Sequence, residues 1–505
     1  MQNRLLNKGK YIPQGVKASI AYFFASVFSK GISYLVTPLY TRLLTPAEYG
    51  QVSVYMTWLE VFGIIAMFCL SYGVFNNGMV DYPDRRDEYA FSMLILSNII
   101  TLCFSAIFLA LYPLIKSVIR MDFPLAILLC IIYFFQPAYN FWYTKQRYEL
   151  KYKATVIVSV ISAIFSPLVA VLLLWKGNGN AVYERIFGAE AVLILIYISF
   201  YVYIFVKNKA KVNTKYWKAA FLFNLPLIPH YLSMYLLGSS DKIMIQHLIS
   251  NEAAAYYSVA HSIAAIALIV WTAINGSLIP YTYEKLKTKD YDAISKVTNP
   301  IMLLFAVACV GVIMLAPEAV WLISTNDYME AIYVIPPIVG GVFFQVQYHV
   351  YSNTVYFYKK PVYVMIASVT AMVLNIVLNY FGIKQFGYIA AGYTTLISYM
   401  VQAGIDYIAM KKVVKENIYN MKYMLLLSIS VVAIALISNL FYGIAWIRYV
   451  ILGILLILAI IFRKKIFAMM KNLLSKKNKE EPQNSKEIDT EGKKETIEQI
   501  KEKEG

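Results

Sequence analysis

The sequence predicts an all-α integral membrane protein with about fourteen transmembrane helices. The chain has 505 residues, of which 59% are hydrophobic and only 15% charged, far from the usual balance of a soluble domain. About fourteen apolar stretches, each near twenty residues, follow one another along the chain. A stretch of that length crosses the bilayer hydrocarbon as a helix whose backbone groups are satisfied internally. The connections between the stretches alternate between basic and charge-poor.

The fourteen predicted spans account for almost the whole chain. They cover residues 17–39, 51–75, 89–112, 123–143, 154–175, 183–206, 219–245, 253–283, 298–316, 330–357, 362–382, 387–410, 423–442 and 445–462. The connections are too short to hold a soluble domain. We therefore expect the activity to take place within the membrane.

The basic residues indicate how the chain is oriented. Alternate loops are rich in lysine and arginine, as at 145–153, 207–218, 285–296 and 411–422. The opposite loops hold only Arg42, Lys116, Arg120, Lys176, Arg185, Lys384 and Arg448. This bias predicts a protein of the cytoplasmic (inner) cell membrane with both termini in the cytoplasm. Because the net charge of +17 lies in loops rather than in one basic patch, nucleic acid is not an expected partner.

The spans predict seven consecutive regions. These are a cytoplasmic N-terminus (1–16), an N-lobe of helices 1–6 (17–206), a cytoplasmic linker (207–218), a C-lobe of helices 7–12 (219–410), a cytoplasmic loop (411–422), helices 13–14 (423–462) and a charged cytoplasmic tail (463–505). The tail is polar and mixed in charge, so it is expected to be disordered.

An internal repeat supports the two lobes. RLLTPAEYGQVSVY (42–55) aligns with HLISNEAAAYYSVA (247–260), and FFQPAYN (134–140) resembles FFQVQYH (343–349). These matches place the first span against the seventh and the fourth against the tenth. Six spans separate each pair, so the repeats are parallel and related by an axis along the membrane normal. Two lobes facing each other across a cavity suit alternating access.

Two matching polar stripes occupy symmetric positions in the repeat. Each stripe follows one face of a helix. They consist of Gln136, Asn140 and Tyr143 in the fourth span and of Gln345, His349, Ser352 and Tyr356 in the tenth. One interpretation is that the stripes line the cavity and contact sugar hydroxyls. The other is ordinary hydrogen bonding between helices.

Several charged residues lie within or at the ends of spans. Lys30 lies in the middle of the first span, where an ammonium group needs a carboxylate, an anionic ligand or water. Glu60 in the second span is a candidate partner, which would make both residues structural. Asp241 and Lys242 either belong to the cavity or neutralise each other, and Arg42 is either a cavity residue or an interfacial anchor.

The usual enzyme motifs are missing from the sequence. There is no GxxxxGK[ST] phosphate loop, no HExxH and no GxSxG. The four cysteines and four histidines show no metal-ligand spacing. We therefore expect a transporter rather than an enzyme, without cofactor or metal. Coupling to protons or sodium ions stays open.

Two segments resemble a known family. GISYLVTPLYTRLLTPAEYGQVSVY (31–55) resembles the opening signature of Wzx-type polysaccharide flippases. SSDKIMIQHLISNEAAAYYSVAHSI (239–263) resembles the matching stretch of their seventh and eighth spans. This family belongs to the same superfamily as multidrug-and-toxin extruders and lipid II flippases. The resemblance implies two six-helix lobes around a central cavity, followed by two further helices.

The resemblance also implies a cargo and a mechanism. The cargo would be an undecaprenyl-diphosphate-linked oligosaccharide, the repeat unit of an O-antigen, lipopolysaccharide or capsule, moved from the inner to the outer leaflet. Membrane lipids and other polysaccharide-assembly proteins would be the partners. Cavities in this group tend to be cationic. Lys30 best matches that expectation, while Arg42 matches the basic residue of the first signature and Asp241–Lys242 the acidic–basic pair of the second.

Two rival functions remain. A cation-coupled multidrug-type antiporter would favour a carboxylate in the first span, which has none, but Glu60 keeps this hypothesis open. A membrane-bound glycan polymerase or ligase would be expected to carry a large external loop. The predicted outer loops are too short for one.

Overall fold

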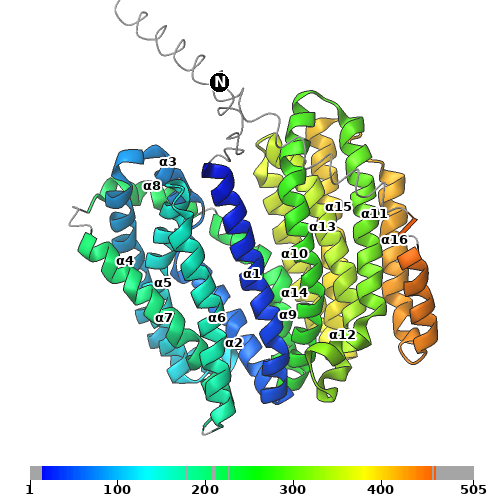
Figure 1. The fold of residues 1–505 in the computed structure, drawn as a ribbon, viewed down its shortest axis with the longest axis horizontal. Helices are drawn as coiled ribbons and strands as arrows, with labels where there is room; N and C mark the ends of the chain where they lie inside the picture. Colours follow the sequence, from blue (N-terminus) through cyan, green and yellow to red (C-terminus); the bar gives the residue numbers. More distant parts are fainter. Residues whose placement is uncertain (1–13, 178, 208–211, 226, 458–459, 462–505) are drawn as a thin grey trace, which may run out of the picture. The chain divides into compact units, whose positions relative to one another are not determined.

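Every secondary-structure element that the structure describes is helical (Figure 1). The structure is a computed structural model and describes residues 14–177, 179–207, 212–225, 227–457 and 460–461. Most of the predicted N-terminal segment 1–16 and all of the predicted disordered tail 463–505 lie outside these described residues.

The first half of the chain forms the helices that surround the candidate site. They are α1 (Gln14–Leu43), α2 (Pro46–Ala66), α3 (Gly73–Asp81), η2 (Pro83–Arg85), α4 (Arg86–Ile119), α5 (Phe123–Tyr148), α6 (Tyr152–Lys176), α7 (Ala181–Lys207) and α8 (Thr214–Asn224). Helix α6 packs against both α1 and α7, and α5 packs against α4 and α7. The short helices α3 and α8 lie side by side at one end of this group (Figure 1).

The described elements of the second half of the chain are also helices. Its elements are α9 (Leu227–Leu248), α10 (Asn251–Lys287), α11 (Tyr291–Met314), α12 (Ala316–Ile323), η3 (Asn326–Tyr333), α13 (Ile335–Phe357), α14 (Pro361–Phe386), α15 (Ile389–Val414), α16 (Met421–Ile437) and η4 (Ser438–Phe441). A further apolar helix covers Ala445–Ile457.

The helices agree with the predicted fold class, which is confirmed. Among the described residues, 8 helices are long and apolar enough to cross a membrane, and 10 spans result when each of two bent helix pairs counts as one. The pairs are α8–α9, bent by 50°, and η3–α13, bent by 53°. The other predicted spans correspond to α1, α2, α15 and the helix Ala445–Ile457. The protein is thus a multi-span integral membrane protein.

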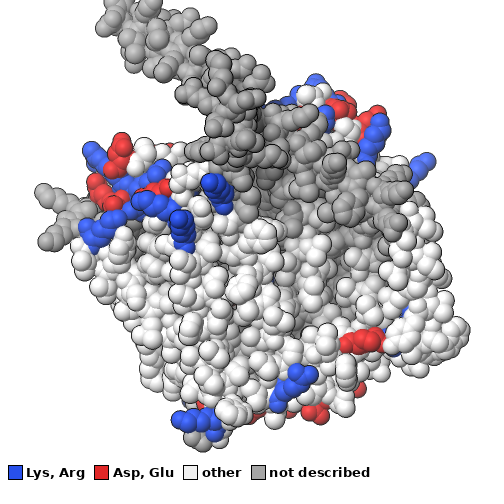
Figure 2. Space-filling view, in the orientation of Figure 1, with Lys and Arg blue, Asp and Glu red and all other residues white. Residues whose placement is uncertain are grey.

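Charged side chains mark the ends of these helices. On the face shown in Figure 2, charged side chains of the first group gather towards the two ends of its long helices and leave an uncharged band between them. Many large apolar side chains of these helices are exposed, for example Leu102 and Ile107 of α4. Exposed apolar side chains over the middle of long helices are what lipid-facing surfaces require.

The second predicted span differs from the structure. Residues 51–75 were expected to form one helix, but α2 ends at Ala66 and α3 begins at Gly73. Phe68 and Cys69 between them have φ angles of 52° and 51°. A right-handed helix cannot continue through left-handed backbone, so the chain turns here.

The described chain divides into two compact units. The first contains the residues up to Ala264, together with Ala316–Gly341 and Met365–Gln402. The second contains Ala265–Leu315, Val342–Val364 and the residues from Ala403 onward. The predicted division into lobes at 206 and 219 stays a prediction.

Within the first unit, the two repeats meet at equivalent residues. The Ser53 and Ser258 hydroxyl oxygens, paired in the alignment of 42–55 with 247–260, lie 2.7 Å apart. One turn earlier, a Cβ atom at Gly50 would overlap the backbone of Asn251, so α2 and α10 approach there as closely as a glycine permits. A residue that contacts its own repeat equivalent lies close to a two-fold axis. The parallel repeat therefore relates α2 to α10.

Candidate functional site

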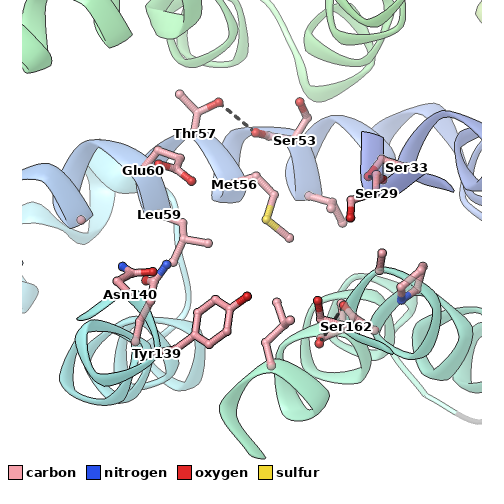
Figure 3. A pocket seen from close by; sticks show the side chains of 18 of the residues that line it. Ser29, Ser33, Ser53, Met56, Thr57, Leu59, Glu60, Tyr139, Asn140 and Ser162 are labelled. Atoms are coloured by element: carbon pink, nitrogen blue, oxygen red, sulfur yellow. Dashed lines mark hydrogen bonds between the residues drawn. The ribbon is translucent and has the colours of Figure 1, made fainter. Parts of the chain in front are cut away.

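A large hollow lies in the first unit, among α1, α2, α5, α6, α7 and α9. Its volume is about 1030 Å³, at the upper end of the range for ligand pockets. We call it the central pocket. Figure 3 shows it from close by, with α2 crossing the view and side chains of α1, α5 and α6 turned towards the same space.

Hydroxyl groups form much of the wall. On α1, Ser29, Ser33 and Thr37 recur every four residues and therefore share one face. On α2, Thr57 donates a hydrogen bond to the carbonyl oxygen of Ser53 (3.0 Å), and both residues line the pocket (Figure 3). Hydroxyls both donate and accept hydrogen bonds, so such a wall suits a ligand that carries many hydroxyl groups.

The first polar stripe lies on this wall. Gln136, Asn140 and Tyr143 of α5 all line the central pocket, and Tyr139 joins them. Tyr139 and Tyr143 also contact each other, with ring centroids 5.9 Å apart. Amide groups and aromatic faces thus stand next to the hydroxyls of α1, α2 and α6. Together they can bind both the polar edges and the apolar faces of sugar rings.

Three charged residues line the central pocket. Arg185 of α7 and Lys242 of α9 are basic, and Glu60 of α2 is acidic. The guanidinium carbon of Arg185 lies 3.9 Å from the centroid of the Tyr40 ring, and its Nη1 atom is buried without a hydrogen-bond partner among the described residues. The described lining therefore carries an excess of positive charge.

The two remaining basic candidates lie elsewhere. Lys30 is exposed and is not among the residues that line the central pocket, although its neighbour Ser29 is. No ion pair joins Lys30 to Glu60 in the described part of the chain. Arg42 is exposed in the last turn of α1. Positive charge at that helix end is favourable because backbone carbonyls there are unpaired.

Asp241 is buried instead of facing the pocket. Its side chain is 0% exposed and accepts hydrogen bonds from Tyr257, Asn379 and Thr395, the last at 2.8 Å. Asn375 and Thr394 extend this network through Asn379. We call these six residues the Asp241 cluster. It joins α9, α10, α14 and α15, so Asp241 is paired with hydrogen-bond donors rather than facing the pocket as Lys242 does.

The second polar stripe belongs to the other compact unit. Trp271 donates a hydrogen bond from its indole nitrogen to His349 (3.1 Å), and the two rings are stacked. Ser352 is buried and donates to the carbonyl oxygen of His349 at 3.2 Å, whereas Gln345 is half-buried and Tyr356 is exposed. None of these four predicted residues lines the central pocket.

Sequence reasoning missed three charged residues as interior ones. Arg185 was counted among the outer-loop residues, yet it lies inside α7 and lines the pocket. Glu190, five residues further along α7, is buried. Asp406, near the end of the predicted span 387–410, is 0% exposed. The signal available was a charge inside or next to an apolar stretch, which usually faces the protein interior.

Comparison with known proteins identifies the family. The family described as "Polysaccharide biosynthesis protein" matches residues 16–285, more than half of the chain. The chain belongs to this family. The MatE family also matches residues 226–381. The predicted resemblance to Wzx-type polysaccharide flippases and their superfamily is thus confirmed.

Two relatives in this comparison come from distant organisms. A Haemophilus influenzae protein of the Lsg locus is 26% identical over 54% of this chain and 67% of its own length. A Haloferax volcanii protein described as a probable low-salt glycan biosynthesis flippase is 23% identical over 76% of this chain and 81% of its own length.

Solved structures share the fold of this family member. The lipid II flippase MurJ in an inward closed conformation superimposes with a TM-score of 0.64 at 15% identity, over 89% of this chain and 100% of MurJ. An inward-facing multidrug resistance MATE family transporter gives a TM-score of 0.57 at 13% identity, over 76% of this chain and 94% of that transporter. At such identities the likeness concerns the fold alone.

Proposed function

We propose that this protein is a flippase that moves lipid-linked oligosaccharides, joined to the lipid through a diphosphate, across the cytoplasmic membrane. The central pocket carries this proposal, because it combines two basic groups with a wall of hydroxyl, amide and aromatic side chains. Its location among six helices of a multi-span protein supports the proposal that this chemistry acts inside the membrane.

The charges suit the diphosphate. Arg185 and Lys242 outnumber the single acidic residue of the lining, Glu60. The planar guanidinium group of Arg185 can donate two parallel hydrogen bonds to a phosphate, and Lys242 adds a compact charge. Neither basic side chain forms an ion pair with a described residue. A diphosphate would supply the negative charge that this pocket lacks.

The remaining wall suits the glycan. Ser29, Ser33 and Thr57 offer hydroxyls, while Gln136 and Asn140 offer amides. Lys30 and Arg42 remain proposed contacts that the cargo would meet outside the central pocket. The second repeat would contribute Asp241 and the stripe Gln345, His349, Ser352 and Tyr356. We propose that these residues act through packing or through contact with the cargo. The lipid tail would stay in the bilayer during transport.

The family and its named relatives support this proposal. One relative is described as a probable glycan biosynthesis flippase, and one solved structure with the same fold is a lipid II flippase. We further propose that both termini lie in the cytoplasm, as the basic loops predict. In that orientation the cargo enters from the inner leaflet and leaves at the outer one. No catalytic reaction on the cargo is part of this proposal.

The test begins with cells that lack this chain. Complete lipid-linked repeat units should accumulate on the cytoplasmic side, and surface polysaccharide should disappear. Mass analysis of the accumulated lipid would identify the glycan. An unchanged pool of lipid-linked sugar in these cells would contradict the proposal.

A second candidate is a cation-coupled small-molecule antiporter. It is favoured by Glu60, which opens into the central pocket, and by the match to the MatE family over residues 226–381. Purified protein in liposomes separates the two candidates. Export of a fluorescent cationic drug under an imposed proton or sodium gradient, without movement of lipid-linked sugar, would favour the antiporter.

A further inference from the structure

A second hollow lies away from the central pocket, at one end of α1, α5 and α6. Its volume is about 540 Å³, and it is lined by the beginning of α1, the end of α5 and the beginning of α6. We call it the basic pocket. Lys17, Lys151 and Lys153 line it together with the amide side chains of Gln14 and Gln146. No aspartate or glutamate is among the lining residues that the structure describes.

The beginning of α6 contributes backbone donors to this pocket. Lys151, Tyr152, Lys153 and Ala154 are the N-cap residue and first turn of α6, and all four line the hollow. The Lys151 side chain does not cap the helix, so the amides of Tyr152, Lys153 and Ala154 are left uncapped, and the first turn holds no acidic residue. The free amides and the helix dipole make the start of a helix favourable for an anion.

Gln146 shows that the pocket is more than a charged surface. Its side chain is only 8% exposed and lines the hollow. It has no hydrogen-bond partner among the described residues, whereas its backbone carbonyl accepts a bond from the Lys151 amide at 2.9 Å. The amide group of Gln146 is therefore available to a ligand or to water in the hollow.

The neighbouring Glu149 neutralises only part of the charge. Its carboxylate pairs with Lys151 at 2.7 Å and with Lys145 at 3.5 Å. Burial raises the pKa of Glu149, but the hydrogen bonds and charges of Lys151 and Lys145 outweigh it and hold the pKa below its usual value. Lys17 and Lys153 form no ion pair with any described residue. These two ammonium groups are therefore free to bind an anion.

We propose that the basic pocket binds the phosphate group of an anionic membrane lipid, separately from the transported cargo. The candidate span Phe123–Tyr148 ends at this pocket, and the candidate span Tyr152–Lys176 begins there. The pocket would therefore lie at the level of the lipid headgroups. Leu150, which connects them, is exposed and apolar, so acyl chains can approach. Basic pockets between helices at this depth are typical sites for phosphate headgroups.

The experiment is a binding titration of the purified full-length protein in detergent by calorimetry. The probes are short-chain phosphatidylglycerol, phosphatidylcholine with the same chains, and inorganic phosphate. Phosphatidylglycerol should bind at least about tenfold more tightly than phosphatidylcholine, and Lys17→Gln with Lys153→Gln should weaken it by about tenfold or more. Gln146→Leu, which changes no charge, should weaken it several-fold.

The control removes the same charge elsewhere. Lys359→Gln with Lys360→Gln alters two exposed lysines that form no described ion pair, and this variant should bind like the original protein. If inorganic phosphate binds as tightly as phosphatidylglycerol and loses the same affinity in Lys17→Gln/Lys153→Gln, the site stands and its ligand is soluble phosphate.

Equal affinities for the two lipids would overturn the proposal. An unchanged affinity in the folded Lys17→Gln/Lys153→Gln variant would overturn it as well. If that variant does not fold, the single change Lys153→Gln at an exposed position gives the same comparison.

Discussion

Lys242 and Asp241 are neighbours on α9, yet they belong to two different polar regions. Lys242 opens into the central pocket and has no ion-pair partner among the described residues. Asp241 is buried and accepts three hydrogen bonds from other helices. A network whose members satisfy one another holds helices together. The charges of Lys242, Arg185 and Glu60 in the pocket form no ion pair with a described residue, so we expect them to be available to a ligand.

The first prediction removes the centre of the Asp241 cluster. Asp241→Ala leaves the donors of Tyr257, Asn379 and Thr395 buried without their acceptor. We expect a loss of roughly 3–5 kcal/mol in the free energy of unfolding. Thermal unfolding of the purified protein in detergent measures this loss as a lower transition temperature. Lys242→Ala is the matched control and should unfold near the original temperature. If both variants are equally stable, the cluster does not hold these helices together.

The second prediction concerns the basic groups of the central pocket. Arg185→Ala removes the guanidinium group proposed to bind the diphosphate, so cargo binding should weaken by about 10- to 100-fold while the unfolding temperature stays nearly unchanged. Arg185→Lys should retain part of the affinity, because lysine keeps the charge without the paired donors. Weaker cargo binding should appear as slower transport of lipid-linked sugar into liposomes.

The control for Arg185 is a basic residue outside the pocket. Lys176→Ala changes an exposed lysine at the end of α6 and should transport normally. Equal transport by Arg185→Ala and the original protein would exclude Arg185 from the cargo site.

The third prediction compares Lys30 with Arg185. Lys30 is exposed outside the central pocket, so Lys30→Ala should reduce export less than Arg185→Ala does. Lys30→Arg should do less harm than Lys30→Ala, because the positive charge remains. Surface polysaccharide in cells carrying each variant reports export, and membrane fractions show that the protein is present. A normal amount of polysaccharide with Lys30→Ala would remove Lys30 from the proposed site.

The smallest predicted effect lies at the beginning of α2. Thr45 and Glu48 form a capping box, in which the Thr45 amide donates to the Glu48 carboxylate at 2.8 Å and the Glu48 amide to the Thr45 hydroxyl at 3.4 Å. Thr45→Ala should lower the free energy of unfolding by about 1 kcal/mol. Thr45→Ser keeps the hydroxyl and serves as the control. Transport should survive in both, since neither residue lines the central pocket.

The sequence alone predicted the spans because each one must be apolar over the full thickness of the bilayer. It also predicted the parallel repeat, and the contact between Ser53 and Ser258 shows where the two copies meet. The stripe Gln136, Asn140 and Tyr143 could be placed on one helix face because the helical period determines which residues share a face.

Only the tertiary structure decided which charges share a pocket and which are buried. Arg185, Lys242 and Glu60 come from three helices that are far apart in the sequence, and no local pattern links them. In the same way, Asp241 and Lys242 are adjacent but point to different surroundings. Helical periodicity gives the direction of a side chain, whereas its neighbours depend on how the helices pack. The sequence therefore determined the membrane architecture and the family, and packing determined the pocket.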